Sequence, residues 1–373
     1  MTTAIEVRNL HHRYRGAGDH PPAVGDVSFE VEENQFFTLL GPSGCGKTTT
    51  LRCIAGLEKP DSGEIRLGEV VVVSDRTFVP THRRDIGMVF QDYAVWPHMT
   101  VFENVAFPLR MRSNRRVRTS ELRNKVMPML EMMGMTQFEK RRATQLSGGQ
   151  QQRLSLARAL VREPEVLLLD EPLSSLDARL RAQMRTELRR VQRQLKVTTV
   201  FVTHDQIEAL SLSNEIAVMQ DGNIVQQGRP RDLYFHPDSE FVGNLVGAAN
   251  LITGVIHTVG DVDSDGIRRL EVATDLGTVV CEDASEQALD TGMSCSVLVR
   301  PEAVLMHHSE PEQRENIFVG RVDLGLFIGE GVEHEVTVGP IGLKIKVPTS
   351  VRFRRDDKVY VEIPSKSCVV FAQ

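Results

Sequence analysis

The stretch FFTLLGPSGCGKTTTLRCIA, residues 36–55, decides the fold of the first part of the chain. FFTLL is a short apolar run, typical of a strand buried on both faces of a mostly parallel sheet. GPSGCGKT, residues 41–48, matches the spacing G-x-x-x-x-G-K-[ST], whose glycines let backbone N–H groups turn inward around an anion. The residues from Lys47 to about Ala55 are expected to form a helix. A strand, a glycine loop and a helix in this order predict an α/β fold with a phosphate site after the strand.

The glycine loop predicts a nucleotide with its metal, ATP and Mg²⁺. Lys47 is expected to reach the β- and γ-phosphates, and the Thr48 hydroxyl is expected to bind Mg²⁺. The alternative is an ordinary tight turn, which the position between strand and helix disfavours. The residues that we expect to bind the nucleotide here are Gly41, Pro42, Ser43, Gly44, Cys45, Gly46, Lys47, Thr48 and Thr49.

A pair of carboxylates follows a second apolar run, in VLLLDEP. We assign Asp170 to the Mg²⁺ shell and Glu171 to the general base that polarises a water aimed at the γ-phosphate. A lone Asp-Glu pair is usually a solvated turn. That reading is disfavoured here because four apolar strand residues precede the pair in a chain that also has a phosphate loop.

Two further polar residues follow apolar runs. His204 ends VFVTHD, and Gln91 follows IGMVF. Open parallel sheets place ligands at the carboxyl ends of their strands, so we expect Lys47, Glu171 and His204 to lie side by side. A histidine at a strand end is more often structural, and only this convergence favours a catalytic role. Gln91 is expected to touch both Mg²⁺ and the attacking water.

The pattern of elements changes along the chain. Between about 93 and 162 no strand is evident and helix formers dominate, which predicts an inserted helical subdomain. Towards the C-terminus, apolar residues alternate with polar ones, as in Leu343, Ile345 and Val347, which indicates antiparallel strands. We therefore predict an α/β P-loop NTPase domain over residues 1–240, with its helical subdomain at about 93–162. An all-β domain of the OB or small-barrel kind follows over 247–373.

Composition excludes several classes of protein. The formal net charge is −6, and 25% of the residues are charged, which argues against a dedicated nucleic-acid binder. Arginines cluster at 110–118 and 179–193, but a solvated helix face explains them better than a nucleic-acid patch. The five cysteines show no CxxC spacing, which fits reduced thiols. The N-terminus lacks the apolar core of a signal peptide, and no apolar run could span a bilayer.

Over about the first 240 residues the set of motifs resembles the ATP-binding-cassette ATPases. The elements are an aromatic before the first strand (Tyr14), GPSGCGKT, the glutamine loop at Gln91, LSGGQ at 146–150, LLLDEP, SSLD at 174–177 and the histidine of VFVTHD. LSGGQ distinguishes the family from kinases and GTPases, which share the phosphate loop. The resemblance implies that Tyr14 binds the nucleotide.

The same resemblance implies a homodimer with two composite sites. Each ATP would lie between the phosphate loop of one subunit and LSGGQ of the other. Ser147 and the backbone of Gly148, Gly149 and Gln150 would meet the γ-phosphate, and Asp177 would cross the same interface. The family also implies membrane permeases as partners, bound at about residues 91–107. Trp96, the only tryptophan, is either an anchor of that contact or a core residue.

The C-terminal part resembles the β-barrel (TOBE-like) extension of solute-importer cassettes, carried by VLVRPEAVLM at 297–306 and GRVDLGLFIGEGVEHEVTV at 320–338. The likeness is closest to ferric-iron and polyamine cassettes and more distant to sugar cassettes. It implies an ATPase subunit of a binding-protein-dependent importer, peripheral on the cytoplasmic face of the plasma membrane, with no nucleic-acid partner.

Two rival functions remain open, a soluble cassette protein of DNA repair or translation and a regulatory ATP sensor. His307 and His308 also suggest a metal ligand pair, but adjacent side chains do not easily share one ion, so a surface loop is preferred.

Overall fold

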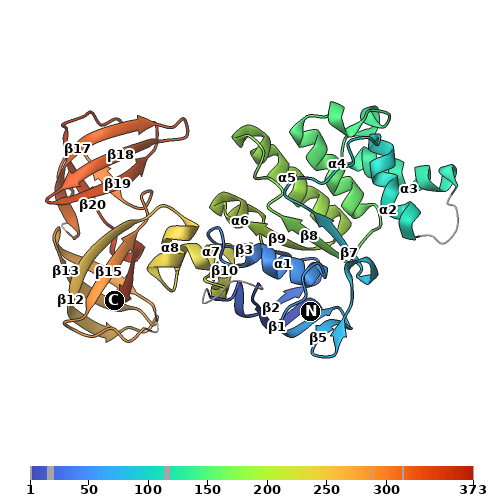
Figure 1. Cartoon of the computed structure of the whole chain (residues 1–373). Helices are drawn as coiled ribbons and strands as arrows, with labels where there is room; N and C mark the ends of the chain where they lie inside the picture. Colours follow the sequence, from blue (N-terminus) through green and yellow to red (C-terminus); the bar gives the residue numbers. More distant parts are fainter. Residues whose placement is uncertain (1, 15–20, 113–117, 286, 313–314, 373) are drawn as a thin grey trace. The chain divides into compact units, whose positions relative to one another are not determined.

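The computed structural model describes residues 2–14, 21–112, 118–285, 287–312 and 315–372 (Figure 1). Contacts divide the chain into two compact units, Met1–Pro230 and Arg231–Gln373. Part of the arginine-rich stretch at 110–118 lies outside the described residues. The predicted domain limits, 1–240 and 247–373, stay a prediction, since the division by contacts falls earlier in the chain, at the start of α7.

The first unit is an α/β domain, as predicted. Its strands are β1 (Thr3–His12), β2 (Val24–Glu32), β3 (Phe36–Leu40), β4 (Ser62–Leu67), β5 (Val70–Ser74), β6 (Thr77–Phe78), β7 (Ile86–Val89), β8 (Val166–Asp170), β9 (Thr198–Thr203), β10 (Glu215–Gln220) and β11 (Asn223–Gly228). Its helices are α1 (Lys47–Ala55), α2 (Val101–Arg112), α3 (Thr119–Met132), α4 (Gly148–Leu160), α5 (Ala178–Leu195) and α6 (Gln206–Leu212), with 3₁₀ turns η1 (Thr81–Arg83), η2 (Thr136–Phe138) and η3 (Ala143–Gln145).

The strands form one mixed sheet in the order β6-β5-β4-β1-β2-β11-β10-β3-β9-β8-β7. The run from β10 to β7 is parallel, and in it β3 lies between β10 and β9. Every residue of β3, β8 and β9 is buried, which agrees with the continuous apolar runs of the sequence. The antiparallel part, β1, β2, β4, β5 and β6, was not foreseen from the sequence.

Two apolar clusters cover the two faces of this sheet, and adjacent residues of β3 point into different ones. Phe37 packs in the cluster that contains Leu51 and Ile54 of α1. Phe36 packs in the other cluster, with residues of α2, α3, α4 and α5. Since successive side chains of a strand point to opposite faces, β3 anchors the glycine loop between both layers.

Residues 93–162 form the helices α2, α3 and α4, and no strand is assigned to the described residues of this segment. Their apolar faces pack with Met184, Leu188 and Val191 of α5. These residues of α5 are spaced four and three apart in the sequence, so they lie on one face of the helix.

A buried arginine ends α1. Arg84 donates from Nη1 to the carbonyl oxygens of Cys53 (2.8 Å) and Ile54 (2.5 Å), and from Nε to that of Val79 (2.8 Å). These contacts satisfy carbonyls that the last turn of a helix leaves without partners. Gly56 follows at φ 73°, and a Cβ there would lie 2.6 Å from Arg84 Nε, so the two residues close the helix together.

The second unit is an all-β domain with two short helices at its start. Its elements are α7 (Pro230–Phe235), α8 (Glu240–Val246), β12 (Asn250–Val262), β13 (Arg268–Thr274), β14 (Gly277–Asp283), β15 (Ser294–Val299), β16 (Leu305–His307), β17 (Ile317–Phe327), β18 (Val332–Val338), β19 (Ile341–Val347), β20 (Lys358–Glu362), η4 (Ser365–Ser367) and β21 (Cys368–Ala372). They form two five-stranded antiparallel sheets, β14-β13-β12-β15-β21 and β16-β20-β17-β18-β19, around one core.

Arg300, directly after β15, ties the two helices to this domain. Its guanidinium donates to the carbonyl oxygens of Gly243 (2.8 Å), Gly247 (2.9 Å) and Tyr234 (3.1 Å). It also lies 4.3 Å from the centroid of the Tyr234 ring. These bonds give a physical reason why α7 and α8 group with the β strands that follow them.

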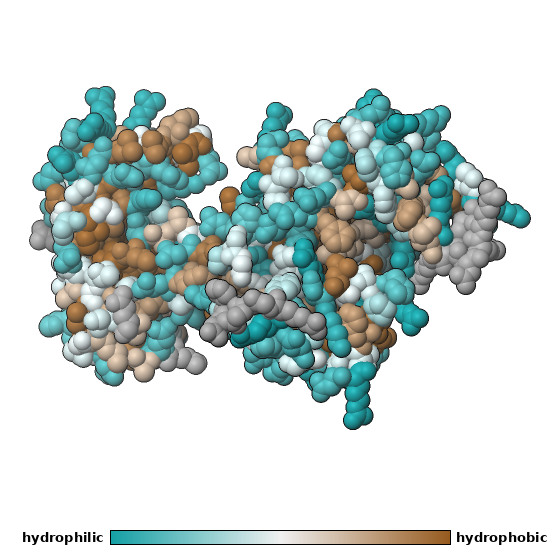
Figure 2. Space-filling view, viewed as in Figure 1, coloured by the Kyte–Doolittle hydropathy of each residue, from teal (hydrophilic) through white to brown (hydrophobic). Residues whose placement is uncertain are grey.

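The surface of the second unit carries exposed apolar side chains on β17 and the turn that follows it (Figure 2). Leu324, Leu326, Phe327 and Ile328 are exposed at the end of this hairpin. Within the part of the chain that the structure describes, no helix is long and apolar enough to cross a membrane.

Candidate functional site

The glycine loop joins β3 to the start of α1 and depends on backbone that only glycine adopts easily. Gly44 and Gly46 have φ of 86° and 104°. A Cβ at Gly46 would lie 2.2 Å from the carbonyl oxygen of Ala23, and one at Gly41 would lie 2.4 Å from that of Met219. The loop therefore packs tightly against its neighbours at the start of α1, where the first N–H groups of a helix have no partner within the helix and suit an anion.

Lys47 folds back over this loop. Its ammonium donates to the carbonyl oxygens of Gly41 (2.9 Å) and Pro42 (2.8 Å), and the residue is only 4% exposed. Cys45 Sγ lies 3.7 Å from the same ammonium. Burial raises the pKa of the Cys45 thiol against the opposing effect of Lys47, so Cys45 packs as a neutral side chain.

The structure brings Thr48 and Asp170 together from positions 122 residues apart. Thr48 Oγ1 donates to Asp170 Oδ1 at 2.9 Å. Asp170 is 4% exposed, and burial raises the pKa of its carboxyl, while the hydrogen bond from Thr48 partly opposes the rise. The half-buried Thr48 hydroxyl and the buried Asp170 carboxylate, in contact with each other, are the hard oxygen donors that Mg²⁺ prefers. The residues present thus fit a divalent cation beside the phosphate loop.

Glu171 and His204 meet at the ends of β8 and β9, which are parallel neighbours. His204 Nδ1 lies 3.2 Å from Glu171 Oε2. The side chain of Glu171 is 16% exposed and that of His204 is 53% exposed. Glu171 also has a φ of 42°, a left-handed conformation that costs a non-glycine residue about 1–3 kcal/mol. The N–H of Glu171 donates to the carbonyl oxygen of Val202, which holds this strained residue in place.

Gln91 follows β7, which pairs in parallel with β8, and its side chain is exposed. No hydrogen bond joins Gln91 to Thr48, Asp170 or Glu171 among the residues described. The structure thus places Gln91 at the same edge of the sheet as the carboxylates but not in contact with them.

Tyr14 follows β1 and does not, as the sequence had suggested, precede the first strand, because residues 3–12 already form a strand. Tyr14 lies over the start of α1. Its hydroxyl is 3.2 Å from Thr49 Oγ1, and its ring is 42% exposed. The ring of His12 meets it edge to face at a centroid distance of 4.8 Å. An exposed aromatic ring beside the phosphate loop is a surface on which a nucleotide base can stack.

The LSGGQ segment forms the N-terminus of α4. The Ser147 N–H donates to Gln150 Oε1 at 3.0 Å, while Ser147 and Gly148 are exposed. A Cβ at Gly149 would lie 2.8 Å from Leu180 Cδ2, so a larger residue there would have to displace the Leu180 side chain of α5. Asp177 begins α5, where its Oδ1 accepts from the Leu180 N–H at 2.9 Å. No hydrogen bond within the described residues links this segment to the phosphate loop of the same chain.

A link that the sequence did not reveal connects the glutamine loop to its surroundings. Tyr93 and Ala94 have φ of 57° and 46°, and Arg158 of α4 donates to both of their carbonyl oxygens, at 2.9 Å and 2.6 Å. The Tyr93 hydroxyl lies 2.6 Å from Ser175 Oγ in SSLD. These contacts join residues far apart in the sequence, and no local pattern predicts them.

Trp96 is half-buried in the same region. Its ring lies 4.2 Å from that of Phe107 between centroids, and the Arg158 guanidinium lies 4.8 Å from its centroid. Trp96 and Arg158 line a small cavity of about 260 Å³, together with Gly87, Phe90 and Pro108.

The two histidines considered as metal ligands do not lie in a loop together. His307 ends β16, and its Nε2 lies 2.7 Å from Glu362 Oε2 on the neighbouring strand. His308 packs on Phe353, with ring centroids 4.3 Å apart. No group of three possible metal ligands from His, Cys, Asp and Glu was found within the described ranges of the chain.

Comparison with known proteins gives two family matches, an ABC transporter model over residues 24–174 and a TOBE domain model over residues 297–371. Among similar curated proteins is the spermidine/putrescine import ATP-binding protein PotA of Thermobifida fusca, 43% identical over 89% of this chain and 83% of that protein. The Fe(3+) ions import ATP-binding protein FbpC 1 of Rhizobium meliloti is 44% identical over 84% of this chain and 83% of its own. The trehalose/maltose import ATP-binding protein MalK of Thermococcus litoralis is 47% identical over 69% and 71%.

Solved structures resemble the first part of the chain. The dimeric structure of MJ0796, a bacterial ABC transporter cassette, has a TM-score of 0.54 at 31% identity and covers 61% of this chain and 99% of its own. The dimeric post-hydrolysis state of the same cassette, bound to ADP and Pi, has a TM-score of 0.54 at 30% identity, with the same coverage.

Proposed function

This chain belongs to the import ATP-binding proteins of the ABC transporter family, and from that premise we propose how its own residues bind and hydrolyse ATP. The reaction is ATP and water to ADP and phosphate, coupled to the import of a small solute. The observation that carries the proposal is the convergence of two contacts at one edge of the sheet, Thr48 with Asp170 and Glu171 with His204.

The glycine loop would hold the phosphates of ATP. The Lys47 ammonium donates to two backbone carbonyl oxygens. When ATP binds, oxygens of the β- and γ-phosphates would replace these carbonyls as its acceptors. The Tyr14 ring would stack on the adenine. Thr48 and Asp170 would hold Mg²⁺, with Gln91 as a further ligand if its exposed side chain turns inward. When bound, Mg²⁺ would neutralise charge on the phosphate oxygens.

Glu171 would be the general base. Its carboxylate would accept a proton from the attacking water, and His204, 3.2 Å away, would orient that carboxylate and contact the γ-phosphate. The strained backbone of Glu171 supports this role, because such strain persists mainly where surrounding structure fixes it for function.

The chain is proposed to act as a homodimer with ATP bound between subunits. Ser147 and Gly148 are exposed at the N-terminus of α4, a site suited to an anion, and no contact ties them to the phosphate loop of their own chain in the described residues. The dimeric state of the cassettes similar in structure supports this arrangement. The exposed side chain of Asp177 would cross the same interface.

Mixing two inactive variants tests the composite site. Lys47→Ala damages the phosphate loop and Ser147→Arg damages the LSGGQ segment, so each homodimer has two defective sites. A mixed dimer has one site with both lesions and one intact site. We expect the mixture, but neither variant alone, to form an ATP-dependent dimer on size exclusion with light scattering. Equal failure of the mixture and of each variant, with both chains folded, would contradict the composite site.

Residues 91–107 are proposed to receive a membrane permease, at the cavity bordered by Trp96 and Arg158. The chain would then work as a peripheral subunit at the cytoplasmic face of the membrane and serve a solute-binding protein indirectly. ATP hydrolysis should increase when the permeases and a loaded binding protein are supplied in vesicles. An unchanged rate in the assembled complex would contradict coupled import.

The solute is proposed to be a polyamine, ferric iron or a similar small solute. Relatives at 43–47% identity are named for spermidine and putrescine, for Fe(3+), and for trehalose and maltose, so this chain alone does not select among them. All three are import proteins, and the second unit matches a TOBE domain. Both findings favour import over a soluble cassette in DNA repair or translation, and over a regulatory ATP sensor.

A further inference from the structure

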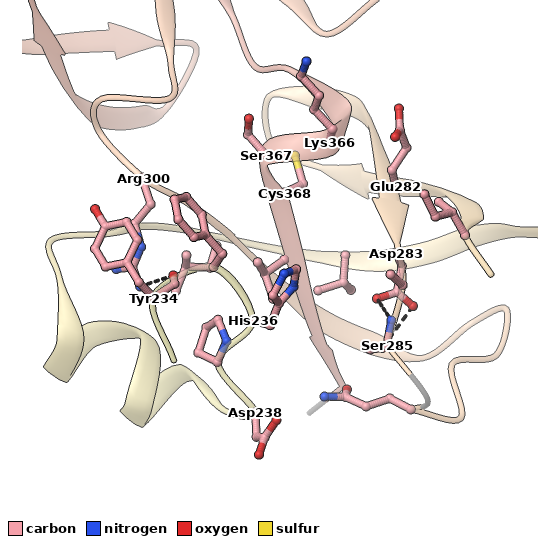
Figure 3. Close-up of a pocket in the computed structure, with 18 residues that line it drawn as sticks. Tyr234, His236, Asp238, Glu282, Asp283, Ser285, Arg300, Lys366, Ser367 and Cys368 are labelled. Atoms are coloured by element: carbon pink, nitrogen blue, oxygen red, sulfur yellow. Dashed lines mark hydrogen bonds between the residues drawn. The ribbon is translucent and has the colours of Figure 1, made fainter. Parts of the chain in front are cut away.

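Two buried carboxylates outside the candidate active site, Asp283 and Glu208, differ in where their partners come from. Asp283 is 6% exposed and borders a cavity of about 810 Å³ in the second unit (Figure 3). It accepts from the N–H and the hydroxyl of Ser285, at 3.2 Å and 3.1 Å, and pairs with Arg268 of β13 at 2.8 Å. These partners lie in or directly beside the β13–β14 hairpin, so the bonds hold that hairpin together.

Glu208 of α6 lies in the first unit, close to the catalytic histidine, and its cationic partner comes from another helix. Glu208 is 3% exposed, and its Oε2 accepts from Thr203 Oγ1 at 2.6 Å. Its Oε1 lies 3.7 Å from Arg181 Nε, on the neighbouring helix α5. Burial raises the pKa of the Glu208 carboxyl, and the hydrogen bond from Thr203 and the charge of Arg181 oppose the rise.

Arg181 holds two further groups at the same time. Its Nη1 donates to Asp205 Oδ2 at 3.1 Å, and its Nη2 donates to the carbonyl oxygen of Leu176 at 3.1 Å. Asp205 directly follows His204 and caps α6, and Leu176 belongs to the SSLD segment. One guanidinium, whose side chain is 29% exposed, therefore joins the turn that carries His204 to the SSLD segment.

The SSLD segment is bonded in turn to Glu171. The N–H and the hydroxyl of Ser174 donate to the carbonyl oxygen of Glu171, at 3.2 Å and 2.9 Å. Glu171 Oε2 lies 3.2 Å from His204 Nδ1, which completes a closed path of contacts and short chain segments. We call this path the contact circuit, and its members are Glu171, Ser174, Leu176, Arg181, Asp205 and His204.

We propose that Arg181 is a positioning residue for ATP hydrolysis, which holds the His204 turn and the SSLD segment so that His204 keeps the Glu171 carboxylate aimed at the attacking water. Arg181 acts through the contact circuit and does not touch the reacting atoms. The inference rests on the roles proposed above for Glu171 and His204. A guanidinium suits this task because its planar fork bonds two acceptors in fixed directions, which a lysine ammonium does not reproduce.

Steady-state ATP hydrolysis by the full-length chain tests the proposal. In Arg181→Met the kcat should fall by up to roughly 10²-fold, because a catalytic group displaced by about 1 Å can lose that much, while the KM for ATP should stay close to that of the parent. Arg181→Lys keeps the charge without the fork and should recover only part of the rate. Arg193→Met, at an exposed position of the same helix, is the matched control and should hydrolyse ATP as the parent does.

A second variant separates positioning from stability. Arg181→Met leaves the buried Glu208 carboxylate without its cation, which costs stability. Glu208→Gln removes that charge and keeps an oxygen that accepts from Thr203, so the double variant Arg181→Met/Glu208→Gln should unfold closer to the parent's midpoint while its kcat stays low. Recovery of kcat together with stability would overturn the proposal, because Arg181 would then only support the fold.

A comparison with His204→Ala tests whether the two residues act on the same carboxylate. In the His204→Ala background, Arg181→Met should reduce kcat little further. Losses that multiply would overturn the proposal, as would a normal kcat in Arg181→Met when His204→Ala is impaired; either result would leave the proposed role of His204 standing. A normal kcat in His204→Ala would refute that role itself, and with it the inference about Arg181.

Discussion

His204 Nδ1 lies 3.2 Å from Glu171 Oε2. Glu171 directly follows β8 and His204 directly follows β9, and these two strands are parallel neighbours. The contact places an imidazole against a carboxylate whose backbone is held at φ 42°. A carboxylate fixed in this way points in one direction, and a water on its free side can lose a proton to it. The geometry suits a base better than a solvated ion pair, because a solvated pair needs no backbone strain.

Glu171→Gln should keep ATP binding and lose hydrolysis. The amide is nearly isosteric with the carboxylate but cannot accept a proton, so the rate should fall by roughly 10²–10⁴-fold. Phosphate release measures the rate, and retained nucleotide on the isolated dimer measures binding. Glu131→Gln, at an exposed position of α3, is the matched control and should hydrolyse normally. Near-normal turnover in Glu171→Gln would remove Glu171 from the role of base.

Asp170→Asn should stabilise the nucleotide-free protein at neutral pH. Burial raises the pKa of Asp170 in the folded state, so the folded chain binds this proton more tightly than the unfolded chain. The contribution of this proton to the free energy of unfolding is fully present below the pKa that the Asp170 carboxyl has in the unfolded chain. It is lost as the pH rises through the higher pKa of the folded state. Above that range the ionised carboxylate lowers the free energy of unfolding, a cost that asparagine avoids.

Urea unfolding followed by Trp96 fluorescence measures this effect, because the only tryptophan lies in the first unit. A chelator in the buffer keeps divalent cations away from the site. The advantage of asparagine should shrink as pH falls towards the usual aspartate range, while hydrolysis is lost at every pH. A variant less stable than the parent at pH 7 would show that the hydrogen bond from Thr48 outweighs burial.

Arg84→Met should destabilise the first unit. Burial lowers the pKa of Arg84 to about 10, but the guanidinium still donates to the carbonyl oxygens of Cys53 and Ile54 at the end of α1 and to that of Val79. Methionine keeps the apolar stem but removes these donors, and among the described residues only the Cys53 carbonyl keeps a partner, the Gly56 N–H, so we expect a cost of about 1–3 kcal/mol. Arg83→Met, the exposed neighbour, is the control. Equal unfolding midpoints for the two variants would rule out this role for Arg84.

The fold was predictable where a local pattern carries it. The continuous apolar runs of β3, β8 and β9 predicted a buried parallel sheet, and α1 begins and ends where the glycine loop led us to expect. The antiparallel strands around β1 and β2 were missed, although VGDVSFEVE alternates between buried and exposed residues. Such alternation indicates a half-buried strand but does not identify the strands with which it pairs.

The sequence likewise predicts the candidate site only where a local pattern places the side chains. Lys47, Glu171 and His204 follow strands, so the topology of parallel sheets predicts their common edge. The hydrogen bonds from Arg158 to the carbonyl oxygens of Tyr93 and Ala94 were not predicted. More than sixty residues separate the partners, and no sequence motif indicates the contact.

Tyr14→Ala should raise the KM for ATP by about tenfold or more with little change in kcat, because a stacked base contributes roughly 1–3 kcal/mol. Tyr14→Phe keeps the ring and removes only the hydroxyl contact with Thr49 Oγ1, so its KM should stay close to that of the parent. The ring of His12 supports Tyr14 edge to face, and His12→Ala should therefore raise KM in the same direction but less. Steady-state kinetics with ATP separate these effects. A Tyr14→Ala variant with a normal KM and a reduced kcat would show that the ring acts on the chemical step and does not hold the nucleotide.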